Sequence, residues 1–163
     1  MQFTHRLDTS YTHESVERVK TLQSLWRTLM KYFVEKGNKV KVKYWPGDLV
    51  IPHSLSSFGI KSIEKHAISK QSLVNLDMEE IICPLNNETT QIIFQEATDN
   101  YGKDSVSNWF NIKILDKEDN SILCSQDFGD TLLVSLLNED IIRLNEMGFS
   151  TDYLITLPEP VPK

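Results

Sequence analysis

The chain has 163 residues, of which 40% are apolar and 25% are charged, and its formal net charge is −6. These fractions are near the averages of folded soluble proteins, which excludes a largely disordered chain. A chain of this length can bury about 70% of its unfolded surface, so it needs no disulfide or metal to fold. No segment has the ~18 consecutive apolar residues of a membrane span or the core of a signal peptide. We therefore expect a cytoplasmic protein with one domain over 1–157 and an extended Pro-rich tail over 158–163.

The first elements in chain order are a short strand and a long helix. Alternation of apolar and polar residues over 1–8 indicates a strand with one buried face. The range 13–36 then has apolar residues every three or four positions, which predicts a helix that ends at Gly37. Its buried stripe is expected to comprise Val16, Val19, Leu22, Trp26, Leu29 and Phe33.

After the helix the apolar period changes to two. Over 39–45, valines and a tyrosine alternate with three lysines, which predicts a strand with one basic face. A Pro-Gly-Asp turn follows, and 49–51 is interpreted as the partner strand. A short helix is expected after Gly59, within a stretch that is otherwise hard to interpret.

The second half is predicted to be mostly sheet. Strands are expected over 81–83, 91–94, 109–115, 122–124, 131–136 and 153–157, with a polar hairpin turn over 116–120. Between the last two strands, Asn138 is expected to cap a short helix that stops at Gly148. The predicted fold class is α+β, an antiparallel or mixed sheet with the long N-terminal helix and the short C-terminal helix packed on one face.

Charge is divided unevenly along the chain. Residues 1–70 hold 12 Lys and Arg against 6 Asp and Glu, whereas residues 71–163 hold 5 against 17. Such asymmetry often marks a charged partner, although two interleaved halves would also neutralise each other.

The acidic half suggests a protein-binding surface that attracts a basic partner. The candidate residues are Asp116, Glu118, Asp119, Asp127, Asp130, Glu139 and Asp140. A solvated turn and helix caps would also explain most of them. We expect a small acidic binding protein, most concretely an inhibitor or immunity protein that neutralises a basic toxin, nuclease or other effector by occupying its surface.

The lysine strand supports an alternative function, nucleic-acid binding. Lys39, Lys41 and Lys43 would lie about 6.6–6.8 Å apart along one face, and Tyr44 and Trp45 could stack on bases. The same lysines would equally suit the wet face of an antiparallel strand, and the overall negative charge opposes a polyanion.

No catalytic or metal-binding motif is present. The serines lack a nucleophile elbow, the glycines form no phosphate or dinucleotide loop, and the acidic residues lack a calcium-loop pattern. His53, His66, Cys83 and Cys124 are spaced too irregularly to indicate a zinc site, and both cysteines are expected to be buried and reduced. We expect no cofactor and favour a binding protein over an enzyme, while an unrecognised active site stays open as a second alternative.

Overall fold

The computed structural model describes residues 2–8, 16–50, 59–95 and 105–158, and everything below concerns these ranges. Their strands are β1 (His5–Leu7), β2 (Lys39–Tyr44), β3 (Ser69–Leu73), β4 (Met78–Pro84), β5 (Asn111–Leu115), β6 (Ser121–Gln126), β7 (Thr131–Val134) and β8 (Leu154–Thr156). Their α-helices are α1 (Val16–Lys36), α2 (Ile60–Ile63), α3 (Asn87–Phe94) and α4 (Asn138–Glu146). The α+β class and the long N-terminal helix predicted from the sequence are therefore confirmed.

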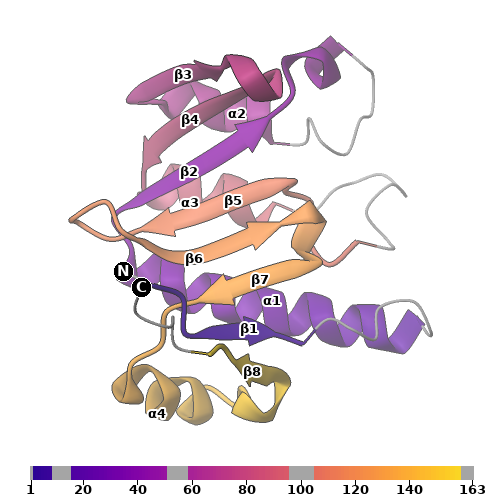
Figure 1. Ribbon diagram of the computed structural model, residues 1–163, viewed down its shortest axis with the longest axis vertical. Coiled ribbons are helices and arrows are strands. Elements are labelled where there is room, and N and C mark those ends of the chain that lie inside the picture. Colours follow the sequence, from indigo (N-terminus) through magenta and orange to yellow (C-terminus); the bar gives the residue numbers. More distant parts are fainter. Residues whose placement is uncertain (1, 9–15, 51–58, 96–104, 159–163) are drawn as a thin grey trace.

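All eight strands form one antiparallel sheet in the order β3-β4-β2-β5-β6-β7-β1-β8. α1, α2 and α3 lie behind this sheet in Figure 1, and α4 lies beyond the edge strand β8. Side-chain contacts agree, because the Trp26 indole of α1 donates to Ser125 Oγ of β6 at 2.9 Å and the Cys83 thiol of β4 donates to Ile63 O of α2 at 3.3 Å.

The core lies between the sheet and these helices. Trp26, Leu29 and Phe33 of α1 are buried as the helical periodicity predicts. Val40, Val42 and Tyr44 of β2 are buried on the same side, and the three lysines between them are not. α1 is described from Val16, so the expected start at residue 13 lies outside the described residues.

Two predicted strands are wrong. The range 91–94 belongs to α3, because Asn86 Oδ1 accepts the Thr89 N–H and Thr89 Oγ1 accepts the Asn86 N–H, a reciprocal cap that starts a helix. The described part of 49–51 belongs to a 3-10 helix, Pro46–Val50, in which Pro46 occupies the favourable first helical position.

The last helix also begins differently from the expectation. Asn138 is its first helical residue, and Leu137 occupies the N-cap position. The Leu137 N–H donates to the Asp140 carboxylate at 2.8 Å. The side chain of Asp140, three residues after the N-cap, therefore caps the start of α4. Gly148 adopts a φ of 81° just after the helix, as a C-terminal stop requires.

Candidate functional site

The face of the sheet opposite α1, α2 and α3 carries a row of residues that crosses every strand. Strand register places these residues directly opposite one another in the order Ser69, Ile82, Lys41, Lys113, Cys124, Leu133, Arg6 and Ile155. We call this set the central row. Because residues directly opposite each other share a face, its two lysines and its arginine all lie on the same side of the sheet.

A second row lies beside the central row and is polar throughout. In strand order it comprises Gln71, Glu80, Lys43, Asn111, Gln126 and Thr131. We call this set the polar row. Together the two rows bring cationic and hydrogen-bonding groups to the middle of this face, beside the apolar side chains of the central row, and they are the candidate site.

Glu80 is the acidic residue of these rows, and it is only 5% exposed. Its carboxylate lies 3.0 Å from Lys41 Nζ and 3.5 Å from Lys43 Nζ, and it accepts a 2.9 Å hydrogen bond from the Gln71 amide. Burial alone would raise the pKa of Glu80, but the two lysines outweigh burial and lower it. Glu80 is therefore ionised at neutral pH and holds both ammonium groups close to the sheet.

The positive charge on this face exceeds what Glu80 balances. Lys113 lies directly opposite Lys41, and adjacent like charges at this spacing repel each other. Within the described part of the chain, neither Lys113 nor Arg6 has an ion-pair partner. Lys39 lies at the margin, paired with Asp119 at 2.7 Å. The face of the sheet opposite α1, α2 and α3, which we call the open face, is thus a basic surface on an acidic protein.

Asn111 gives the polar row an unused acceptor. Its side chain is 9% exposed, and its Oδ1 is buried without a hydrogen-bond partner in the described ranges. Phe110, which precedes Asn111 in the chain, packs on two other aromatic rings, with Trp45 tilted against it at 4.1 Å between ring centroids and Phe128 edge-on to it at 5.5 Å.

The structure separates the residues of the nucleic-acid alternative. Lys39, Lys41 and Lys43 share the open face as predicted. Tyr44 is fully buried on the opposite face, where its hydroxyl donates to Glu79, so it has no ring surface to offer to a base. Trp45 is half-buried and already packs against Phe110.

The acidic hairpin residues are mostly engaged within the chain. Asp116 accepts hydrogen bonds from the backbone N–H groups of Glu118 and Asn120, both at 2.9 Å, and so shapes the β5–β6 turn. Asp119 adopts a φ of 65° and pairs with Lys39. Glu118 is exposed, and its carboxylate lies 4.0 Å from Nζ of its neighbour Lys117.

The other acidic candidates lie elsewhere. Asp127 and Asp130 are exposed and flank the turn between β6 and β7, at the opposite end of β6 from the hairpin. Glu139 is exposed on α4, whereas Asp140 is 1% exposed and is held by Tyr32, Lys36 and the Leu137 N–H. The seven residues therefore do not form one acidic surface.

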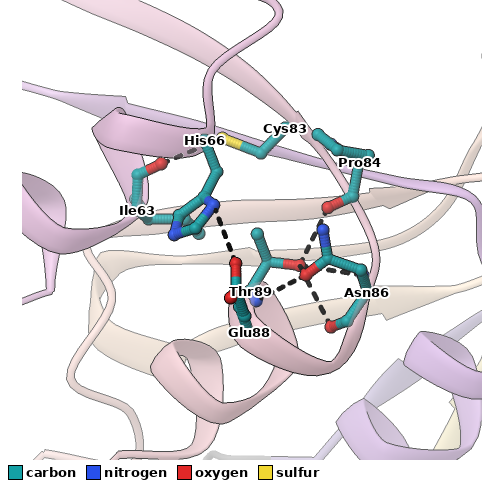
Figure 2. A network of polar contacts seen from close by, with 7 residues as sticks. All are labelled: Ile63, His66, Cys83, Pro84, Asn86, Glu88 and Thr89. Carbon is teal, nitrogen blue, oxygen red and sulfur yellow. Dashed lines mark hydrogen bonds and ion pairs between the residues drawn. The ribbon is translucent and has the colours of Figure 1, made fainter.

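The two cysteines cannot share a site. By strand register Cys83 points toward the helices and Cys124 toward the open face, and both are buried free thiols. Figure 2 shows Cys83 over Ile63, next to the polar contacts in which His66 lies 3.5 Å from Glu88 and Thr89 donates to Pro84 O. Burial raises the pKa of Cys83 to about 11, which makes it a poor nucleophile.

Potential metal ligands do not cluster within the described ranges, where no group of three or more His, Cys, Asp or Glu could hold an ion. His53, one of the four residues considered from the sequence, lies outside the described residues. Among the helices described, none has the length and apolar composition of a bilayer span.

Sequence reasoning missed Arg6, Glu80, Lys113 and Asn111. Lys113 had a readable signal, because it stands between Ile112 and Ile114 and so faces away from the core. Comparison with protein-family models, curated proteins and solved structures finds no match to this chain.

Proposed function

We propose that this protein is a binding module that acts by occupying the surface of another protein, and that the partner docks on the open face of the sheet through an acidic surface. The observation that carries the proposal is the central row, in which Lys41, Lys113 and Arg6 share one face and neither Lys113 nor Arg6 has an ion-pair partner among the described residues. An acidic partner would supply the opposite charge that Lys113 and Arg6 lack within the described residues.

This proposal changes the expected charge of the partner. The sequence favoured a basic partner because residues 71–163 carry most of the acidic groups. Their dispersal, together with the internal roles of Asp116, Asp119 and Asp140, favours the basic face instead. An inhibitor or immunity function fits this arrangement if the protein covers an acidic surface of its effector.

A protein fits the open face better than a nucleic acid. Stacking surfaces are scarce because Tyr44 is buried and Trp45 packs on Phe110. Lys41 and Lys43 share one carboxylate, which reduces the charge that each offers to a phosphate. The net charge of −6 also repels a long polyanion, whereas a local acidic protein surface feels mainly the face that it touches.

The test compares two charge reversals of equal size. One variant combines Arg6→Glu with Lys113→Glu, which disrupts no described ion pair. The matched control combines Glu118→Lys with Asp127→Lys, two exposed acidic residues in turns. Each variant and the wild-type protein are used to recover partners from the native cell extract, with and without nuclease. The rate at which the recovered partner associates with each protein is then measured over a range of salt concentrations.

The proposal predicts that the Arg6/Lys113 variant loses the partner and that the Glu118/Asp127 variant keeps it. Loss with the acidic reversal alone would restore the basic partner expected from the sequence. Recovery that depends on intact nucleic acid, and that the Arg6/Lys113 reversal abolishes, would assign the face to nucleic acid. A partner unaffected by both reversals would show that neither charged surface is the interface.

A further inference from the structure

β3 forms one edge of the sheet and has no neighbouring strand on its outer side in the described residues (Figure 1). Its residues 69–72 are exposed. Exposed apolar side chains flank it, with Ile68 at 63%, Val74 at 86% and Leu76 at 58% of their full exposure. An open edge with exposed apolar flanks is a template for pairing with a further strand.

The backbone groups that face outward from this edge follow from the ladder pattern. The Leu85 N–H donates to Asn38 O, so the odd-numbered residues of β4 bond to β2 and the even-numbered ones bond to β3. The odd-numbered residues of β3 pair with those even-numbered residues. Lys70 and Ser72 consequently direct their N–H and C=O groups away from the sheet.

We propose that β3 pairs with β3 of a second copy of this chain, antiparallel, about a two-fold axis at Gln71. In this register Lys70 lies opposite Ser72 of the second copy. The outward N–H of each residue can then donate a hydrogen bond to the outward C=O of the other. Ile68 and Val74 lie three residues to either side of Gln71. The ladder ends before them, because Ile68 precedes β3 and Val74 begins the 3-10 helix Val74–Leu76, but antiparallel pairing brings the exposed apolar flank at each end of one β3 next to the opposite flank of the second copy.

The charges on this edge permit the pairing. Lysine on an edge strand usually discourages association, but the Lys70 ammonium is held at 2.6 Å by Glu64 and at 2.8 Å by Glu79 of its own chain. An axis at Lys70 would place two lysines directly opposite each other, which is unfavourable, whereas an axis at Gln71 places glutamine opposite glutamine. The pairing is symmetric and therefore closes at two copies rather than growing into a filament.

The experiment measures the molar mass of the full chain by sedimentation over a range of concentrations. Ser72→Pro removes one outward N–H and leaves the bonds to β4 in place, since proline is tolerated where the N–H faces solvent. Val74→Lys places charge on the apolar flank without touching the ladder. Ile142→Lys is the matched control, because Ile142 is 60% exposed on α4, beyond the opposite edge of the sheet. Circular dichroism and thermal melting verify that each variant folds.

We expect the wild-type protein to pass from monomer to dimer as concentration rises. Ser72→Pro and Val74→Lys should each weaken dimerisation by about tenfold or more, and Ile142→Lys should leave it unchanged. A wild-type protein that stays monomeric at the highest concentration it tolerates would overturn the proposal. A dimer that survives Val74→Lys but is lost with Ile142→Lys would also overturn it, by placing the interface at α4.

Discussion

Tyr32 and Asp140 join the first and last α-helices of the described chain, because the Tyr32 hydroxyl donates a 2.5 Å hydrogen bond to the Asp140 carboxylate. The same carboxylate accepts from Lys36 Nζ at 2.6 Å and from the Leu137 N–H at 2.8 Å. Burial alone would raise the pKa of Asp140, but the hydrogen bonds from Lys36, Tyr32 and Leu137 together lower it. This buried acidic residue therefore stabilises the helix pair in its ionised form.

We predict that Asp140→Ala lowers the free energy of unfolding by about 3 kcal/mol, since it leaves hydrogen-bond donors on three residues without their acceptor. Glu139→Ala, in the same helical turn but exposed, should change it by less than about 0.5 kcal/mol. Urea unfolding of both variants measures the difference. Equal losses would show that Asp140 acts only through the general effect of acidic groups at a helix start.

The same pair predicts how stability depends on pH. Because folding lowers the pKa of Asp140, its contribution is present above the usual aspartate pKa and is lost as pH falls through the lowered value. Burial and the Asp140 hydrogen bond raise the pKa of Tyr32 to about 12. Its contribution is therefore complete below the usual tyrosine pKa of about 10 and is lost as pH rises toward 12. Tyr32→Phe should remove this alkaline decline, and an unchanged alkaline limb in urea unfolding would contradict the assignment.

Trp26 should be among the most sensitive positions of α1. Trp26→Ala removes a buried ring and should cost about 3–5 kcal/mol, whereas Lys31→Ala on the exposed side of the helix should cost almost nothing. Trp26→Phe isolates the indole contribution, because it leaves Ser125 Oγ without its donor at a cost of about 1–3 kcal/mol. Calorimetric melting orders the variants, and equal shifts for Trp26→Ala and Lys31→Ala would contradict the packing of α1.

Glu80→Gln tests the electrostatics of the open face. The substitution keeps the side-chain shape and removes one negative charge, so Lys41 and Lys43 lose their shared carboxylate. We expect a loss of about 1–2 kcal/mol in stability and faster association with an acidic partner, because the face becomes more positive. Glu118→Gln makes the same change in net charge in the hairpin turn and should alter neither quantity. Urea unfolding measures stability, and stopped-flow binding to the recovered partner measures association.

The thiols should be inert in the folded protein. Cys83 and Cys124 are buried and burial raises the pKa of each, although Lys113 and Lys43 partly oppose the effect at Cys124. We predict slow reaction with a disulfide reagent in buffer and complete reaction in denaturant.

Dialysis against a chelator should leave the melting temperature unchanged, and bound zinc lost together with stability would disprove this prediction.

Alternation within single strands predicted much of the fold. It correctly separated the lysines of β2 from Val40 and Val42, and helical periodicity correctly placed Trp26 in the core. The range 91–94, with three consecutive apolar residues, was ambiguous, since so short an apolar run fits a strand or part of a helix equally well. The deciding Asn86–Thr89 cap uses threonine where glutamate or glutamine is the usual signal.

The candidate site was harder to predict than the elements that carry it. Lys41, Lys113 and Arg6 are aligned only because β2, β5 and β1 take particular places and registers in the sheet. Alternation indicates which face a residue occupies but not which residue of another strand lies beside it. The acidic residues show the converse limit, because sequence gives Asp140 and Glu139 the same charge and cannot show that one of them is buried.

The position of β1 between β7 and β8 has a consequence for how the chain folds. Thr4, just before β1, contacts Val134 of β7 across 130 positions of sequence, and β8 pairs with β1. Closing so long a loop is slow, because the chain loses conformational entropy before the contacts between β1 and β7 can stabilise the closed loop. The hairpins β3–β4, β5–β6 and β6–β7 are local and can form early. We therefore expect β1 and β8 to join the sheet last in refolding and to open first in hydrogen exchange, as one cooperative unit.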